Sequence, residues 1–393
     1  MPATYNGQFI VEISADDVTY TDYTSYVINA TLRVGRQQLT DRYTPDVLNV
    51  ELLAPLTSGP AIPPLGYYVR IYNFTGYAAS QYLYKGIISE VNRNYGMPYT
   101  SATGAAPADR ISITALVRNT YFMGRAYNNA RIITAGISAK IAVDTIVLDG
   151  CGLSVAATYV GIPGGGSAAF WDNWPMQGET YSGIVLDYVN TTLQGTVSRM
   201  KDQGKSTFQM IQGDQTQGNT FNFSDGTGST TGWTATYGYD AIDFVASQDN
   251  SYTAVRMTYN TSSSTTSSTG SAPFSTYQVT SNTQTLAKAD SAADYTLAIL
   301  GQSQYRPFSI STRAKIMSNP LLPEQLAVSS TIGTQVWIMF RGTTYYCILE
   351  GFTITQDLDD ARYTFYFSPS VGQALILDST AFGILDTNTL GIG

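Results

Sequence analysis

Alternating hydrophobic and polar positions dominate the first 125 residues. Apolar side chains recur at every second position over short runs, which is the pattern of half-buried β-strands. Loops rich in Pro and Gly, such as 56–66 and 96–109, separate these runs. Short strands spaced in this way predict a closed or nearly closed antiparallel sheet. The apolar positions that carry the pattern are Phe9, Val11, Ile13, Leu48, Val50, Leu52, Val69, Ile71, Ile111, Ile113 and Ala115.

The hydrophobic period changes between residues 126 and 207. Ser138 would cap a helix that ends at Gly150, and Thr180 would cap a second helix that ends at Gly195. These two amphipathic helices predict a separate α-containing segment.

The alternating pattern returns at about residue 208. FQMI (208–211) and several later runs predict strands, and ARYTFYFS (361–368) alternates most regularly, with Tyr363, Phe365 and Phe367 on one side. A third helix is predicted over 286–300, where one face carries Leu286, Ala289, Ala293, Leu297 and Leu300. NTSSSTTSSTGS (260–271) has no apolar residue to bury and predicts an exposed loop.

Together these patterns predict a mainly β chain in four parts. They are a first β-barrel domain (1–125), a small α-containing insertion domain (126–207), a second β-barrel domain with one helix (208–372) and a C-terminal extension (373–393).

The C-terminal extension repeats a short unit, ILDSTAFG (376–383) followed by ILDTNTLG (384–391). Each unit has an apolar pair, an Asp that can initiate a turn, an apolar anchor and a Gly. Such a segment has no core of its own, so it must lie on a surface that is already built. That surface is either its own last barrel or a neighbouring subunit, and the contact residues would be Leu377, Phe382, Leu385 and Leu390.

The composition favours β-sheets whose surfaces are packed but remain partly exposed to solvent. Hydrophobic residues make up 43% of the chain and charged residues 13%, about half the usual share. The 29 Tyr residues suit strands that still face water or a partner. A net charge of −8 without a run of Lys and Arg argues against nucleic-acid binding by phosphate neutralisation.

The absence of histidine removes most common catalytic machinery, including Ser-His-Asp and Cys-His sites and histidine-based metal sites. Glycoside hydrolysis remains possible, because it needs only two carboxylic acids. The candidate acids are Asp16–Asp17, Asp240, Asp243 and Asp359–Asp360. Solvated turn residues are the favoured interpretation of these acids, because adjacent acids on a strand point to opposite faces. The expectation is therefore no enzyme activity, no cofactor and no metal site.

Two further features bear on chemistry and location. Cys151 and Cys347 are expected to be buried free thiols rather than a disulfide, because their contexts differ. The N-terminus lacks the features of a signal peptide, and no stretch approaches eighteen apolar residues, so neither secretion by that route nor a membrane span is expected.

FWDNWP (170–175) is the most concentrated aromatic feature. Trp171 and Trp174 could form a sugar-stacking platform or a cation-binding shelf. The favoured interpretation is that the two rings pin a loop onto its own domain. A carbohydrate-binding or glycan-cleaving protein of the host surface is therefore the alternative function.

Several stretches, in order, resemble minor tail proteins of long-tailed bacteriophages. The opening VEISADDVTYTDYTSYVINATLRVGRQQLTDRYTPDVLNVELLAP (11–55) is similar to the start of such proteins, and YLYKGIISEV (82–91) with RISITALV (110–117) resembles a strand pair of the same domain. The stretches 234–260 and 290–300, and the C-terminal repeat, resemble later parts of the family.

This resemblance implies a tail-tip or baseplate hub protein. Its two barrels would be related to tail-tube proteins and would assemble as a ring, often a homotrimer, that closes the tube and carries the fibre or spike. Partners would be copies of the chain and neighbouring distal tail, tape measure and fibre or spike proteins. The chain would be assembled in the host cytoplasm and reside in the virion tail.

Overall fold

The structure of the chain is a computed structural model, and it is mainly β, as the sequence predicts. Strands account for most of the described residues, which also include one long α-helix. The described residues are 9–38, 41, 46–55, 62–72, 82–94, 108–117, 131–133, 158–160, 179–181, 198–201, 209–212, 219–245, 252–260, 262–270, 274–280, 285–301, 306–313, 332–356 and 360–370.

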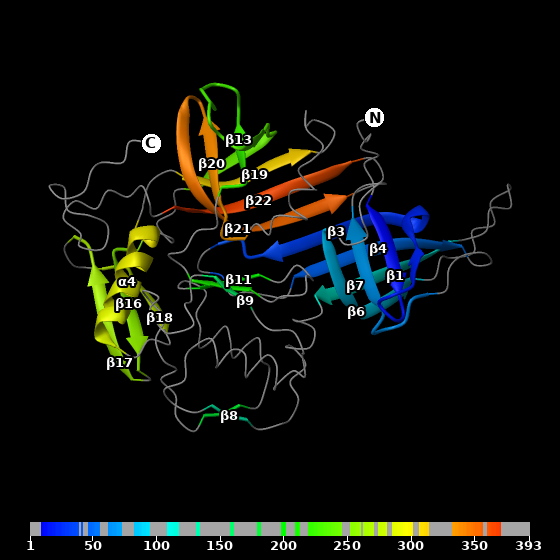
Figure 1. Cartoon of the computed structure of the whole chain (residues 1–393), viewed down its shortest axis with the longest axis horizontal. Coiled ribbons are helices and arrows are strands. Elements are labelled where there is room, and N and C mark those ends of the chain that lie inside the picture. The colour runs from blue at the N-terminus through cyan, green and yellow to red at the C-terminus, as the bar shows by residue number, and fades with distance from the viewer. Residues whose placement is uncertain are drawn as a thin grey trace.

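The first unit of the fold is a curled sheet near the N-terminus (Figure 1). Its strands pair antiparallel in the order β2-β1-β5-β6-β7-β4-β3. In chain order they are β1 (Ile10–Ser14), β2 (Tyr20–Asp22), β3 (Val27–Gly35), β4 (Val47–Pro55), β5 (Tyr68–Tyr72), β6 (Tyr84–Asn94) and β7 (Ala108–Val117).

The two outer strands of this sheet follow one another in the chain. β2 ends at Asp22 and β3 begins at Val27, with the 3-10 turn η1 (Thr24–Tyr26) between them. That link reaches at most about 18 Å, whereas six strand spacings in a flat sheet make about 29 Å. The sheet must therefore curl to bring its two edges together.

The second unit is built by strands from the later half of the chain, in the order β14-β13-β20-β21-β22-β19-β15. Its outer strands, β14 and β15, are again consecutive, so this sheet curls for the same reason. In chain order the strands are β13 (Phe221–Ser224), β14 (Ala235–Tyr237), β15 (Ala241–Val245), β19 (Arg306–Arg313), β20 (Gln335–Phe340), β21 (Thr343–Gln356) and β22 (Ala361–Pro369).

The two units have the same strand order. Counted along the chain within each unit, both sheets run second, first, fifth, sixth, seventh, fourth, third. The directions agree for every pair except those of the first strand, since β1 is antiparallel to both of its neighbours and β13 is parallel to both of its own. The fold is thus an internal duplication in topology.

Local details repeat as well. The ladder between the sixth and seventh strands shifts register at the same step in both units, after Ile88 in β6 and after Leu349 in β21. A glycine with positive φ precedes the fifth strand in each, Gly66 at +85° and Gly333 at +82°. Each glycine donates its backbone N–H to the residue before the shift, Gly66 to Ile88 and Gly333 to Leu349. These turns need left-handed backbone, which glycine adopts without strain.

A helical insert separates the third and fourth strands of the second unit. It consists of α4 (Leu286–Leu300) lying on a small sheet of β16 (Ala254–Tyr259), β17 (Ser263–Ser268) and β18 (Thr276–Thr280) (Figure 1). The predicted helix is confirmed, and four of its five predicted face positions are buried. Leu286, in the first turn, is 53% exposed instead.

The prediction of a loop over 260–271 is wrong for its central part. β17 pairs antiparallel with β16 along its whole length. Its hydroxyls bond to α4, since Thr265 donates to Asp290 and Ser267 donates to Asp294 at 2.5 Å. A strand without apolar residues is stable here because a partner strand satisfies its backbone and a helix satisfies its side chains.

Short strands represent the expected α-containing segment among the described residues. β8 (Arg131–Ile133) pairs with β10 (Glu179–Tyr181), and β12 (Gln209–Gln212) pairs with β11 (Ser198–Lys201) and β9 (Thr158–Val160). The expected start of the second helix is wrong, because Thr180 and Tyr181 belong to β10. Backbone pairing with β8 and the strand preference of Thr and Tyr outweigh the helical spacing there. The first expected helix, 138–150, lies outside the described residues.

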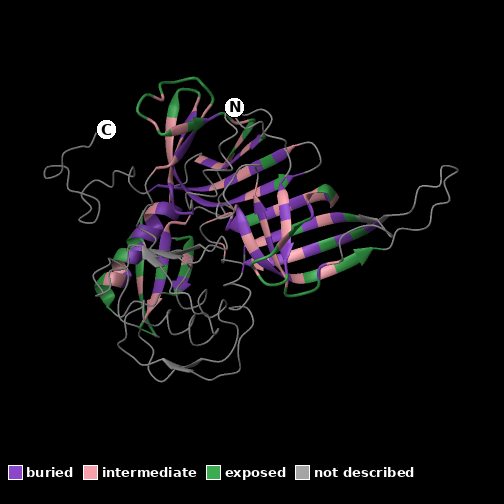
Figure 2. Cartoon of the chain, turned by 45° about the vertical axis from the view of Figure 1, so that its right-hand side comes forward, coloured by how far each residue is buried: buried purple, intermediate pink, exposed green. Residues whose placement is uncertain are grey.

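The hydrophobic core runs through both units, with buried residues along the strands of each (Figure 2). Every apolar position predicted for the first unit is buried, and so are Tyr363, Phe365 and Phe367 of the second. Phe223 packs against Phe365 with ring centroids 5.2 Å apart. Cys347 is buried and free, as expected, and Cys151 lies outside the described residues.

The two units are joined edge to edge. β3 pairs antiparallel with β21, from Gly35 opposite Gly351 to Ala30 opposite Gln356. Strands of both expected β domains therefore share one sheet, while the domain boundaries near 125 and 208 stay a prediction.

Substituting Gly351 tests how closely the two strands approach. A Cβ at this position would lie 2.3 Å from the backbone oxygen of Arg36 and 2.6 Å from that of Val34, so one strand must move. Gly351→Ala is expected to lower the free energy of unfolding by about 3 kcal/mol or more, as overpacking against backbone does. Urea unfolding measures it. Gly238→Ala is the control, because nothing lies within 4 Å of its Cβ; equal stability of the two variants would contradict the account.

Candidate functional site: a buried junction and open strand edges

The site residues predicted from sequence lie outside the described residues. This holds for Leu377, Phe382, Leu385 and Leu390 of the C-terminal repeat, and for Trp171 and Trp174. Their roles stay predictions.

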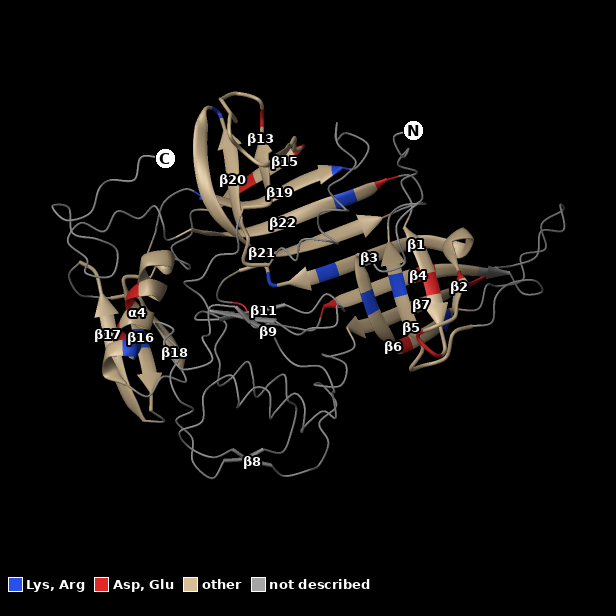
Figure 3. Cartoon of the chain, in the orientation of Figure 1, with Lys and Arg blue, Asp and Glu red and all other residues tan. Residues whose placement is uncertain are grey.

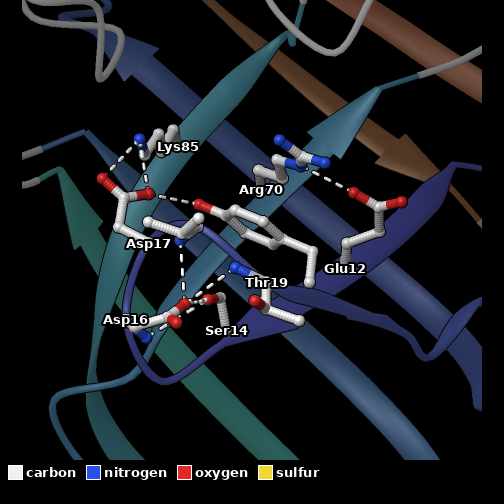
Figure 4. Close-up of polar contacts among 9 residues, drawn as sticks. Glu12, Ser14, Asp16, Asp17, Thr19, Arg70 and Lys85 are labelled. Atoms are coloured by element: carbon white, nitrogen blue, oxygen red, sulfur yellow. Dashed lines mark hydrogen bonds and ion pairs between the residues drawn. The ribbon is translucent and has the colours of Figure 1, made fainter.

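The candidate acids Asp16 and Asp17 belong to the tight turn between β1 and β2 (Figure 4). One Asp16 oxygen accepts the backbone N–H groups of Val18 at 2.9 Å and Thr19 at 2.8 Å, and also the Ser14 hydroxyl. The hydrogen bonds from Thr19 and Val18 hold the pKa of Asp16 below its ordinary value. Asp16 is therefore a turn-capping carboxylate, as the favoured interpretation has it.

Asp17 ties the same turn to the neighbouring strands. It has a φ of +64°, forms an ion pair with Lys85 of β6 at 2.5 Å and accepts the Tyr20 hydroxyl. Burial, with the hydrogen bond to Asp17, raises the pKa of Tyr20. The Arg70 guanidinium lies 3.7 Å from the centre of the Tyr20 ring, a cation–π contact that pins the turn to the sheet.

The other candidate acids also have structural partners. Asp240 forms an ion pair with Arg313 at 2.9 Å, Asp243 accepts the Ser309 hydroxyl at 2.7 Å, and Asp360 accepts the backbone N–H of Ala361. Asp359 lies outside the described residues. These carboxylates cap turns and link strands rather than converging on one another.

Charged residues are sparse on the described strands, and the two signs are interspersed (Figure 3). Within the described ranges, no group of three or more Asp, Glu or Cys residues is placed to hold a metal ion. None of the described helices is both long and apolar enough to cross a membrane.

Among the described residues, the most deeply buried ion pair lies where the two units meet. Arg36 follows β3, and its Nε lies 3.0 Å from a carboxylate oxygen of Glu350 in β21, with both side chains fully buried. The other carboxylate oxygen accepts the Ser368 hydroxyl at 2.5 Å. The backbone N–H of Arg36 donates to the Glu350 backbone oxygen at 3.1 Å, which continues the β3–β21 ladder.

A second cation lies near the same carboxylate. Burial lowers the pKa of Arg306 in β19, while the nearby Cys347 and Glu350 act in the opposite direction. The Glu350 carboxylate therefore interacts with residues of both units, Arg36 of the first and Ser368 of the second. Glu350 lies at the register shift of β21, which lets its side chain point into the junction.

Sequence reasoning missed this junction, although a signal was present. An acid inside the apolar run YYCILEGFTIT (345–355) is costly to bury unless it is paired. Arg36 follows a glycine of positive φ, Gly35 at +72°, that turns the chain toward β21.

Several strands have no described neighbour on one side, and two of these open edges bear on assembly. Beyond its register shift, β6 pairs only with β7 among the described strands, and four of its five residues there, Glu90–Asn94, are exposed. β15 likewise pairs only with β19 within the described ranges. Open edges offer unpaired backbone groups and are natural docking sites for another strand.

Comparison with known proteins gives a likeness in structure alone: no family model and no curated protein matches the sequence. A tail protein from Neisseria meningitidis MC58 superposes with a TM-score of 0.55 at 9% identity, covering 92% of this chain and 96% of that one. The 43 kDa tail protein of prophage MuSo2 from Shewanella oneidensis gives 0.58 at 8% identity, covering 92% and 99%. The chain has the fold of a phage tail protein. The likeness extends over nearly the whole length of both structures and over 92% of this chain, so it includes both of the chain's units.

Replacing Glu350 by Gln tests the junction of this tail-protein fold. The variant keeps the shape and leaves the buried Arg36 guanidinium without its carboxylate, so a loss of about 3–5 kcal/mol in the free energy of unfolding is expected. Asp240→Asn, in the half-exposed pair with Arg313, should cost less than about 1 kcal/mol. Urea unfolding compares the two; a Glu350 variant as stable as the Asp240 variant would show that the junction does not need the charge.

Proposed function

We propose that this chain is a structural protein of the phage tail tip, a baseplate hub or minor tail protein. It closes the tail tube and connects it to fibre or spike proteins through ring-like self-assembly. The observation that carries the proposal is a tail-protein fold made of two units with the same strand order and with edges left open.

Ring assembly follows from the duplicated topology. Within one chain the units already meet edge to edge through β3 and β21. A head-to-tail contact between copies generates a closed ring when its rotation closes. The ring would contain two similar units for each chain. The sequence resemblance favours a homotrimer.

The proposal includes no catalysis. The carboxylates considered for glycoside hydrolysis act as turn caps and ion-pair partners in the described residues. The partners are further copies of the chain and the distal tail, tape measure, and fibre or spike proteins, in a virion tail assembled in the host cytoplasm.

Mass photometry of the purified chain, with mass spectrometry of purified virions, tests this function. The full chain is expected to form a discrete closed oligomer, and its peptides are expected in virions. Deleting residues 376–393 should leave thermal unfolding unchanged and weaken the oligomer, because the C-terminal repeat would then no longer dock on a neighbour. A monomeric chain that is absent from virions would refute the proposal, whereas unchanged assembly after the deletion would place the repeat on its own unit.

A further inference from the structure

Among the described strands, the same strand edge is filled in one unit and open in the other. In the second unit, residues 351–356 of β21 carry β3 on the side opposite β22. In the first unit, residues 90–94 of β6 occupy the equivalent place after the register shift, with β7 on one side and no described strand on the other.

Burial follows this difference. Phe352 and Ile354, on the filled edge of β21, are 1% and 0% exposed. At the equivalent places on β6, Val91 is half-buried and Arg93 is exposed. Since a strand covers this edge in β21, a strand would fit the same edge of β6, which has no described neighbour.

The strand that fills the edge also has a counterpart. β3 is the third strand of the first unit, and it pairs with the fourth strand on one side and with β21 on the other. β15 is the third strand of the second unit and pairs with its own fourth strand, β19. Its other side has no described strand.

From these two equivalences we infer that β15 of one copy pairs antiparallel with the open edge of β6 of the next copy, repeating between chains the contact that β3 and β21 make within one. The inference rests on the ring assembly of the proposed function and names its surfaces. The occupant is a second copy, because each chain carries both halves of the contact on different faces. Such a head-to-tail contact can continue around a ring.

The β6 residue that takes part in the proposed contact follows from the pairing of the sixth and seventh strands in each unit. Glu90 is the first residue paired with the seventh strand after the shift, as Gly351 is in β21. Counting on from these residues, Asn94 is equivalent to Thr355.

The β15 residue that takes part in the proposed contact follows from the pairing of the third and fourth strands in each unit. Thr31 of β3 pairs with Asn49 of the fourth strand, and Asp243 of β15 pairs with Ser309. Asn49 and Ser309 are equivalent, because each lies opposite the seventh-strand residue that pairs just after the shift. Thr31 faces Thr355 within the chain, so Asp243 is expected to face Asn94 of the next copy.

A cysteine pair tests the contact. Asn94 and Asp243 are both exposed, so neither substitution disturbs the core. Opposed residues of an antiparallel pair have Cα atoms about 4.5–5.5 Å apart, within the range that a disulfide spans. Asn94→Cys/Asp243→Cys should give covalently linked oligomers on oxidation, at least about tenfold more than the control, and reductant should reverse them. The control is Asn94→Cys/Thr236→Cys, because Thr236 is an exposed residue of the other outer strand, β14.

The outcomes separate this inference from the proposed function when gels without reductant are combined with mass photometry. Linked oligomers from the Asp243 variant alone support the contact. An oligomer that does not become linked, or that is linked equally in the control, overturns the contact and leaves ring assembly standing. A disulfide within a single chain overturns the contact too, because the two edges would then belong to one copy. A chain that stays monomeric overturns both.

Discussion

The ion pair between Arg36 and Glu350 is the constraint on which the arrangement of the two units depends. Both side chains are fully buried, and burial of an isolated charge would cost far more than a domain can spare. The pair forms only if β3 runs alongside β21 and turns at Gly35, and only if β21 shifts register where Glu350 lies. A buried pair of this kind stabilises little over an apolar substitute, but it excludes arrangements that would leave either charge alone. It therefore specifies how one unit is set against the other.

Because the topology is duplicated, the contact at this junction could also form between chains. The two units share strand order, the register shift of the sixth strand and the glycine turn before the fifth. They differ beyond the register shift of the sixth strand, where β21 pairs with β3 on the side opposite β22, whereas β6 has no described strand on the side opposite β7. A chain with one filled and one open copy of the same edge is suited to forming a ring, since each added copy fills the edge that the previous copy leaves open. The proposed tail-tip role needs such closure and does not need a catalytic site.

Much of the fold could be predicted from the sequence because strand faces have a simple period. Tyr363, Phe365 and Phe367 alternate in the sequence and are buried in the structure. β17 could not be predicted, because its stability comes from β16 and from Asp290 and Asp294 of α4 rather than from its own apolar residues.

The site was harder to predict than the fold. The junction depends on a pairing between residues more than three hundred positions apart, which no local pattern encodes. The duplication is also invisible locally, because it lies in strand order and in two register shifts. The predicted contact residues of the C-terminal repeat and the tryptophan loop lie outside the described residues.

Backbone hydrogen exchange in the assembled protein tests the central claim, that one edge-to-edge contact operates both within and between chains. Amides that are hydrogen-bonded in a ladder exchange slowly, whereas those of an open edge exchange fast. The account predicts that peptides covering 90–94 and 241–245 become as protected in the oligomer as those covering 351–356 and 30–35. An oligomer in which 90–94 and 241–245 exchange as fast as in dissociated chains would contradict it.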